Sequence, residues 1–358
     1  MNAAIITFHC SYNFGSALQA YALQRSIEKC GHEATIIDYR SRDFDNYKLI
    51  KIARPNTMLR LLRDYDKNVK RKRSFVAFWE SYFHQTSKRF NYKKEAQLKC
   101  LASCYDCFVC GSDQIWNLDC THGVVEPYFL SFAGDRRRVA YAPSLAHTTF
   151  RPENFDEVKV AGLLSKFDYL SVREEETLPL FQPLVDKPID VVLDPTLLLD
   201  ALDYADMAES PVVEGEYTFL YLLRDCPELI ESVQRMADGS DMRFVYVSDR
   251  NLSIPNSINL FGIGPDEFVS LIAHAQFVLT NSFHATVFSV LFHKPFRVYA
   301  TDKSGSRMRD LLANLGIGER CVSRTYTEPI APVDWSSVDS KLGGLRDHSW
   351  HYLRKALS

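Results

Sequence analysis

Short apolar runs alternate with segments of helical periodicity along this chain, and this alternation constrains the fold most strongly. Residues 3–8 form an apolar run typical of a strand, residues 16–30 carry apolar side chains at helical spacing, and residues 34–39 are apolar again. Two strands joined through a helix by short connections form a right-handed crossover, in which the strands are parallel. The start of the chain therefore predicts a parallel α/β domain.

The alternation continues and then restarts after a polar stretch. Further strands are predicted in the first half at 107–110, 138–142, 169–172 and 190–193. After a polar segment that contains Pro and Gly, the second series has strands predicted at 217–223, 244–247, 277–279 and 296–299 and helices at 265–275 and 286–292. We predict two α/β domains and a helical tail, with bounds 1–210, 211–325 and 326–358.

The composition is that of an ordinary folded protein. The chain has 358 residues, of which 46% are hydrophobic and 24% charged, so it can bury two cores. It contains no apolar run of about 18 residues and begins without the features of a signal peptide, which predicts a cytoplasmic protein. The nine cysteines are an odd number, and we expect reduced thiols.

A net charge of −3 conceals one strongly basic segment. Residues 40–99 hold 17 Lys and Arg against 6 Asp and Glu. Leu, Phe and Trp side chains are interspersed at 48–89, which predicts two amphipathic helices. Two interpretations stay open: the segment contacts an anionic membrane surface, or it is a solvated helical insertion packed on the sheet. No nucleic-acid recognition motif accompanies the charge, so we predict no nucleic-acid partner.

Four closely spaced cysteines resemble an incomplete metal-binding motif. Cys100, Cys104, Cys107 and Cys110 are closely spaced. An offset of three within a strand turns Cys107 and Cys110 to opposite faces, which keeps them from sharing an ion. We predict no metal site.

The most informative segment is a strand that runs directly into a helix through Ser282, Phe283 and His284. This places His284 at the carboxyl edge of a parallel sheet beside a helix N-terminus, where α/β proteins bind anionic ligands. Lys303 and Arg307 follow the next predicted strand, so they should emerge at the same edge and suit a phosphate. The alternative interpretation is a structural histidine and a solvated basic loop.

The first half has two comparable strand ends. Asp113, Gln114 and Trp116 form a dense polar turn after the strand at 107–110, and Arg173 ends the strand at 169–172. A carboxylate in such a turn can accept the proton of a hydroxyl, whereas the alternative is that Asp113 and Gln114 cap a helix.

Together these motifs resemble the polysaccharide pyruvyl transferase family. The resemblance extends from about residue 5 to about residue 315, and its motifs occur in the family's order. It rests on the segments Asn13–Gln19, Gly111–Asn117, Ser171–Glu174, Asp194–Thr196 and Ser282–His284. The chain departs from the family at Ala285, where Gly is usual, and at Asn281, where Asp is frequent, which affects substrate detail.

The resemblance implies a two-lobed fold like that of GT-B glycosyltransferases, with the active site in a cleft. It also implies phosphoenolpyruvate as donor, a saccharide acceptor that is either free or lipid-linked, and a pyruvate ketal as product. Arg173, His284 and Lys303 would bind the donor, with Arg307 as a further cation and contributions to substrate binding from Asn13, Gly15, Ser282, Gln114 and Trp116. A histidine can exchange protons near neutral pH, so we assign His284 as the acid and Asp113 as the base, with no cofactor or metal.

Two other functions fit the same sequence. One is a GT-B-type glycosyltransferase that uses a nucleotide sugar, and the other is a non-catalytic glycan-binding homologue. Neither the acceptor sugar nor its reacting hydroxyls can be identified from the sequence.

Overall fold

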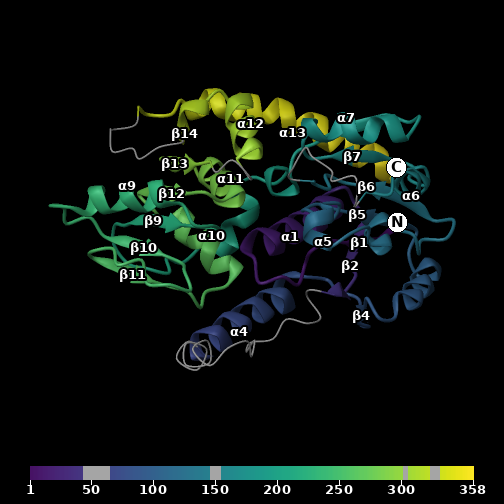
Figure 1. Ribbon diagram of the computed structural model, residues 1–358, viewed down its shortest axis with the longest axis horizontal. Coiled ribbons are helices and arrows are strands. Elements are labelled where there is room, and N and C mark those ends of the chain that lie inside the picture. The colour runs from purple at the N-terminus through teal and green to yellow at the C-terminus, as the bar shows by residue number, and fades with distance from the viewer. Residues whose placement is uncertain (43–64, 146–154, 301–304, 323–330) are drawn as a thin grey trace. The chain divides into compact units, whose positions relative to one another are not determined.

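A computed structural model describes residues 1–42, 65–145, 155–300, 305–322 and 331–358 (Figure 1). The chain divides into two compact units, which are described separately. Unit 1 contains Met1–Tyr47, Trp79–Leu199 and Gly344–Ser358, and unit 2 contains Lys48–Phe78 and Asp200–Gly343. No helix within the described ranges is both long enough and apolar enough to cross a lipid bilayer.

Unit 1 is built on a four-stranded sheet in the order β2-β1-β5-β6, with all neighbours parallel. The strands are β1 (Asn2–Ile6), β2 (Glu33–Ile36), β5 (Cys107–Cys110) and β6 (Arg137–Ala140). Ile5 pairs with Ile36 on one side and with Val109 on the other. Residues 3–6 are at most 1% exposed, because both faces of a parallel sheet are covered. The predicted parallel α/β domain is confirmed.

The crossover between β1 and β2 is helix α1 (Phe14–Lys29). The Asn13 side chain caps its first turn by accepting a hydrogen bond from the Ser16 amide at 3.1 Å. Gly31 follows the last turn with a φ of 84°, a left-handed conformation that favours glycine. Asn13 and Gly31 therefore define the two ends of this helix, which begins two residues before the predicted start at 16.

Smaller elements complete unit 1. Two further parallel pairs form, β3 (Tyr39–Arg40) with β4 (Phe90–Asn91) and β7 (Leu170–Val172) with β8 (Ile189–Val191). The short helices are α5 (Leu118–Thr121), α6 (Glu157–Leu164) and α7 (Leu178–Phe181), with 3-10 helices at Glu95–Ser103, Glu126–Phe129, Glu175–Thr177, Gln182–Leu184 and Pro195–Leu197.

Unit 2 has a six-stranded sheet in the order β11-β10-β9-β12-β13-β14, again fully parallel (Figure 1). Its strands are β9 (Thr218–Tyr221), β10 (Phe244–Tyr246), β11 (Ser257–Asn259), β12 (Phe277–Thr280), β13 (Phe296–Tyr299) and β14 (Cys321–Val322). Its helices are α8 (Ala205–Ala208), α9 (Pro227–Ala237), α10 (Pro265–Ala273), α11 (Phe283–Leu291) and α12 (Ser306–Asn314), with 3-10 turns at Ala201–Tyr204 and Gly318–Arg320. The second predicted α/β domain is thus also confirmed as a parallel sheet.

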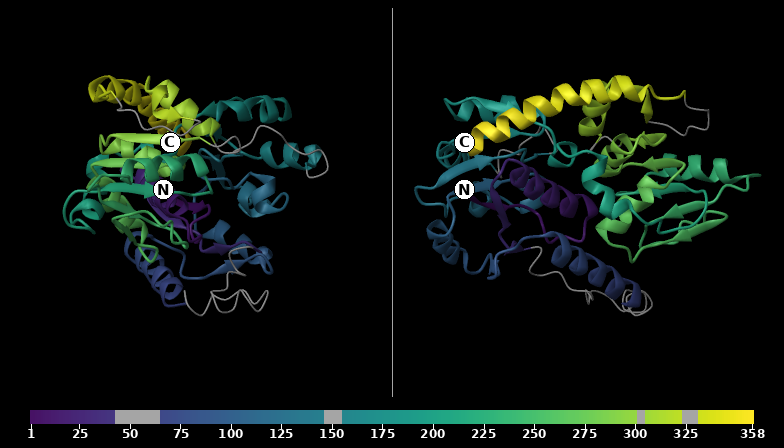
Figure 2. Two further views of the ribbon diagram at one scale, coloured as in Figure 1. Left: turned by 60° about the vertical axis from the view of Figure 1, so that its left-hand side comes forward. Right: turned by 180° about the vertical axis from the view of Figure 1, so that it is seen from behind.

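The C-terminal helix α13 (Trp335–Leu357) is one continuous element that contributes residues to both units (Figure 2). In unit 1 the Leu193 amide donates to Ser349 Oγ at 3.0 Å, and the Tyr352 hydroxyl donates to the Ala140 carbonyl at 2.8 Å. Leu353 and Leu357 are fully buried. The predicted tail at 326–358 therefore supplies part of the core of unit 1.

The division into units differs from the predicted bounds in two places. The boundary follows Leu199 instead of residue 210. Helix α4 (Tyr65–Tyr82) begins in unit 2, although we assigned the basic insertion to the first domain. In unit 2 Ser74 Oγ donates to the Gly262 carbonyl at 3.0 Å, and the Arg71 guanidinium lies 5.0 Å from the centre of the Phe261 ring. Of the two helices predicted at 48–89, α4 is described, and residues 43–64 lie outside the described part.

Candidate active site

In unit 2 the end of β12 is joined to the end of the neighbouring strand β9 by Asn281. Its side-chain oxygen accepts a hydrogen bond from the Leu223 amide at 2.7 Å, and its amide nitrogen donates to the Arg224 carbonyl at 2.8 Å. Ser282 caps α11 by accepting a hydrogen bond from the Ala285 amide at 3.4 Å. Asn281 thus fixes the strand end that carries the Ser-Phe-His segment, a role that an amide fills and a carboxylate in its place could not, because a carboxylate has no donor.

His284 is half-buried in the first turn of α11. Its ring packs against Phe283 with a centroid distance of 5.3 Å, and the Arg307 guanidinium lies 5.5 Å from the centre of the same Phe283 ring. The structure therefore brings His284 and Arg307 to one place in unit 2, as the sequence predicted. Lys303 lies outside the described residues.

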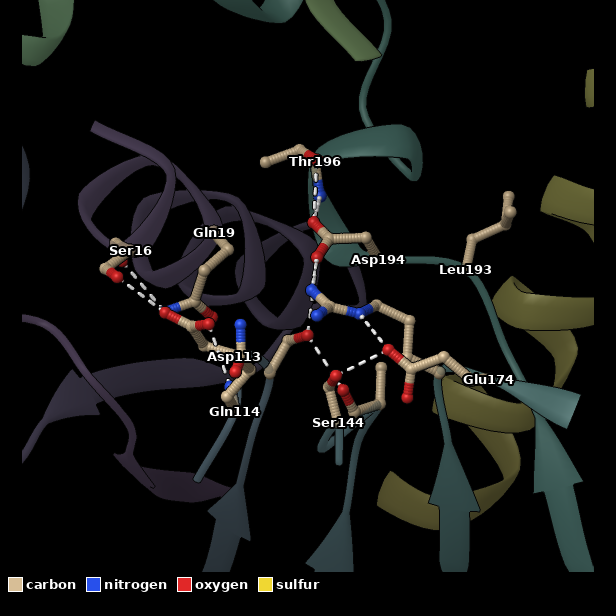
Figure 3. A network of polar contacts seen from close by, with 12 residues as sticks. Ser16, Gln19, Asp113, Gln114, Ser144, Glu174, Leu193, Asp194 and Thr196 are labelled. Carbon is tan, nitrogen blue, oxygen red and sulfur yellow. Dashed lines mark hydrogen bonds and ion pairs between the residues drawn. The ribbon is translucent and has the colours of Figure 1, made fainter. Parts of the chain in front are cut away.

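In unit 1 the turn after β5 carries Asp113. Gly111 has a φ of 116°, and a Cβ atom there would lie 1.9 Å from the Tyr141 carbonyl oxygen, so only glycine fits. Asp113 is 8% exposed; its Oδ2 accepts a hydrogen bond from Ser16 Oγ at 2.5 Å, and its Oδ1 accepts one from the Gln114 amide at 2.8 Å (Figure 3). Helix α1 thereby orients the carboxylate through one hydroxyl.

Arg173 directly follows β7 and lies between two carboxylates. Its Nη1 donates to Asp194 Oδ2 at 2.5 Å and its Nε to Glu174 Oε1 at 3.1 Å, and its side chain is 4% exposed. Burial disfavours the charged guanidinium, but Glu174, Asp194 and Asp113 outweigh this effect and raise the pKa of Arg173. A donor phosphate would have to compete with these carboxylates, and donor binding by Arg173 stays a prediction.

The network around Arg173 includes residues that the sequence did not single out as site residues. Ser144, which follows β6, donates from its Oγ to Glu174 Oε1 at 2.5 Å. Asp194 also accepts hydrogen bonds from the amide and the hydroxyl of Thr196 (Figure 3). Glu174 and Asp194 belong to the motifs that carry the family resemblance, so the sequence marked them without giving them a role. Ser144 had no such signal.

The buried position of Trp116 contradicts its predicted role in substrate binding. This residue is 1% exposed, its ring stacks on Phe129 with centroids 5.1 Å apart, and its indole nitrogen donates to the Tyr128 carbonyl at 3.0 Å. A side chain so enclosed is part of the core and has no surface for a substrate. An aromatic residue beside a polar turn predicts a binding group, but the sequence does not show on which side of the turn the ring packs.

The remaining predicted residues have local structural contacts. The Gln114 side chain accepts a hydrogen bond from Asn117 Nδ2 at 2.9 Å, which holds the turn. Asn13 is the cap of α1, and Gly15 lies buried in its first turn. Their predicted contacts with substrate stay predictions.

The family can now be identified. A family model described as polysaccharide pyruvyl transferase matches residues 13–303, which include the Asp113 turn, the Arg173 network and the His284 helix entry. The chain belongs to this family. The recognition made from the motifs is therefore confirmed, and this polysaccharide pyruvyl transferase family member is expected to act in polysaccharide synthesis as a transferase. A search of curated protein sequences found no match.

Several solved structures resemble this chain at low identity. A putative UDP-N-acetylglucosamine 2-epimerase from Listeria monocytogenes is 10% identical, with a TM-score of 0.51, over 99% of this chain and 90% of that one. The UDP-GlcNAc 2-epimerase of Methanocaldococcus jannaschii is 13% identical, with a TM-score of 0.49, over 96% and 92%. An E. coli heptosyltransferase is 10% identical, with a TM-score of 0.43, over 89% and 99%. The first of these supports the predicted fold class, two Rossmann-like domains of the GT-B type.

Proposed function

We propose that this protein transfers a pyruvyl group from phosphoenolpyruvate to two hydroxyls of a saccharide, forming a ketal and releasing phosphate. The observation that carries the proposal is the family match over residues 13–303, which includes a half-buried histidine at the start of α11. The acceptor belongs to a cell-surface polysaccharide or to its lipid-linked precursor.

The reaction needs a proton donor, a proton acceptor and a leaving phosphate. One sugar hydroxyl attacks the carbon that carries the phosphate ester, and the methylene carbon takes a proton to become a methyl group. The second hydroxyl then forms its bond to the same carbon as the phosphate leaves, and its proton goes to the phosphate. Two C–O bonds form, one C–O bond to phosphate breaks, and nothing is oxidised or reduced, so the step as written needs no cofactor or metal.

In unit 2 we assign His284 as the acid that protonates the methylene carbon. Arg307 supplies a cation beside the same Phe283 ring, and charge-assisted hydrogen bonds suit a phosphate or carboxylate. Lys303, which follows β13 in the sequence, is proposed as a second cation for the donor. General acid catalysis of this kind contributes roughly 10²–10⁴-fold.

In unit 1 we assign Asp113 as the base that receives the acceptor's proton. The Ser16 hydroxyl and the Gln114 amide hold its two oxygens, so the carboxylate is oriented before substrate binds. Deprotonation of a sugar hydroxyl by an oriented carboxylate is ordinary general base catalysis.

The test replaces His284. His284→Gln should reduce phosphate release from phosphoenolpyruvate in the presence of acceptor by at least about a hundredfold, while thermal unfolding stays as in the parent. His293→Gln is the matched control, because His293 is an exposed histidine of unit 2 that pairs with Asp339. Equal activity of the parent and His284→Gln would remove His284 from the mechanism.

A further inference from the structure

A separate polar cluster lies at the carboxyl edge of the sheet of unit 1, in segments that follow β1 and β2. Oδ1 of Asp38 accepts hydrogen bonds from His9 Nε2 at 3.2 Å and from Arg40 Nε at 2.6 Å. Oδ2 of Asp38 accepts one from Arg89 Nε at 2.9 Å. One carboxylate thus contacts three basic side chains.

His9 is positively charged in this cluster. Its Nδ1 lies 3.3 Å from the Thr7 carbonyl oxygen while its Nε2 faces Asp38, and only an imidazolium can donate from both nitrogens. Burial opposes the charged form, but Cys10 and Asp38 outweigh it and raise the pKa of His9 to about 9. The two arginines alone give the cluster two positive charges against the one carboxylate of Asp38, so it holds an excess of positive charge.

The two arginines are oriented by Asp38 but keep most of their donors. Each guanidinium bonds the carboxylate through Nε alone, and the Nη groups of Arg40 and Arg89 donate to no residue in the described part of the chain. The side chain of Arg40 is 15% exposed and that of Arg89 is 64% exposed, so both reach solvent. A guanidinium presents paired donors that match the oxygens of a phosphate or carboxylate.

Two aromatic rings lie on the Arg40 side of the cluster. The Arg40 guanidinium lies 5.6 Å from the centre of the Trp79 ring, and Trp79 contacts Tyr12 with ring centroids 5.6 Å apart. Tyr12 is half-buried and belongs to the loop between β1 and α1. Trp79 is buried, so Tyr12 is the ring that a ligand could reach. An aromatic ring near oriented cations is suited to a sugar that carries an anionic group, because the ring packs against the apolar face of the sugar.

We infer that Arg40 and Arg89, oriented by Asp38, bind an oxyanion carried by the saccharide acceptor, either a phosphate or a carboxylate. The anion site follows from the excess positive charge and from guanidinium donors that no described residue uses. Only the identification of its ligand as the acceptor rests on the proposed function. The acceptor is then a charged sugar, a glycosyl phosphate or a uronic acid.

The test is calorimetric titration of the full-length protein, in the absence of donor, with galactose 1-phosphate, galacturonate and galactose. The parent should bind at least one of the two charged sugars, and the tighter of these identifies the anion, while uncharged galactose should bind more weakly. Arg89→Gln and Arg40→Gln should each weaken binding of the charged sugar by at least about tenfold, since each removes hydrogen bonds to a charged group. Arg25→Gln is the control, because Arg25 is a partly exposed arginine of unit 1 that pairs with Glu28.

The exposed position of Arg89 keeps the test decisive even if Arg40→Gln fails to fold. Parental affinity for the charged sugars in Arg89→Gln, or equal binding of galactose and its charged forms by the parent, would overturn the inference. No binding of either charged sugar would also overturn it. Because no turnover is measured, a failure of pyruvyl transfer would leave these results unchanged and would bear on the proposed function alone.

Discussion

Two polar clusters of unit 1, one around Arg173 and one around Asp38, differ in the sign of their charge. Around Arg173 the carboxylates of Asp194 and Glu174 outnumber the cation, whereas around Asp38 the cations outnumber the carboxylate. An excess of negative charge favours a group that accepts a proton, and an excess of positive charge favours an anionic ligand. In each cluster some residues, among them Asp38, Arg173 and Asp194, follow the ends of parallel strands, where such sheets place their sites.

Gly111 provides a stability prediction. Gly111→Ala would require a left-handed φ of 116° and would put a Cβ atom 1.9 Å from the Tyr141 carbonyl oxygen. We expect a loss of about 3 kcal/mol or more in the free energy of unfolding, measured by urea denaturation. Gly162→Ala is the control, because a Cβ atom there meets nothing within 4 Å and the site lies in α6, so this change should stabilise by about 0.5–1 kcal/mol. Similar stabilities for the two variants would contradict the assigned close approach.

The charged His9 makes stability depend on pH. The pKa of His9 is raised from the ordinary histidine value of 6.5 to about 9 in the folded protein, so its contribution is complete below about pH 6.5 and is lost as the pH rises through 9. Urea denaturation of the parent should show this decline, on the order of 3 kcal/mol at most. His9→Gln should be less stable at pH 6.5 and should lack the decline. A parent whose stability is constant from pH 6.5 to 9 would show that His9 is neutral.

At the scale of elements, hydrophobic periodicity located the main strands and the crossover helix. Cys107–Cys110 and Phe296–Tyr299 have the predicted bounds, because continuous apolar runs are required where both faces of a parallel strand are covered. The three-residue strand Ser257–Asn259 and the two-residue strand Cys321–Val322 were missed, since each is half-buried and too short for a periodic signal. The cluster around Asp38 was also not predicted, because His9, Asp38 and Arg89 are far apart in sequence and meet only through the strand order.

Helix α4 is the element for which we predict binding to an anionic membrane surface. The basic segment predicts that Lys70, Arg71, Lys72 and Arg73 face outward. Lys70, Lys72 and Arg73 are exposed, whereas Arg71 is half-buried and packs over Phe75 and Phe261. If the acceptor is lipid-linked, the protein should sediment with anionic liposomes at low salt and not at high salt.

The matching variant changes Lys67, Lys72 and Arg73 to Gln, and its control changes the exposed Lys93 and Lys94 of unit 1. Only the first should reduce sedimentation with anionic liposomes. Recovery of the parent in the supernatant under all conditions would favour an acceptor that is not held on a membrane.

At the scale of the whole molecule, the sequence predicted two parallel α/β domains but not how the chain is shared between them. Helix α13 returns to unit 1, where Arg346 donates to the carbonyls of Leu197 at 2.6 Å and Leu199 at 2.8 Å. A domain assignment that follows the chain in order cannot anticipate such a return, because periodicity gives the apolar face of a helix but not the sheet that it covers. The family motifs lie at strand ends, which can be found from sequence, and the assignment of the active site to them stays a prediction.

The most direct test of the central claim is the identity of the group transferred. The protein is incubated with phosphoenolpyruvate or with nucleotide sugars and a panel of galactose- and mannose-containing acceptors, some of them phosphorylated, and both inorganic phosphate and product mass are measured. We predict that phosphoenolpyruvate gives an acceptor heavier by one pyruvate ketal, with one phosphate released per product. An acceptor that is unchanged by phosphoenolpyruvate but gains a sugar from a nucleotide sugar would contradict the account.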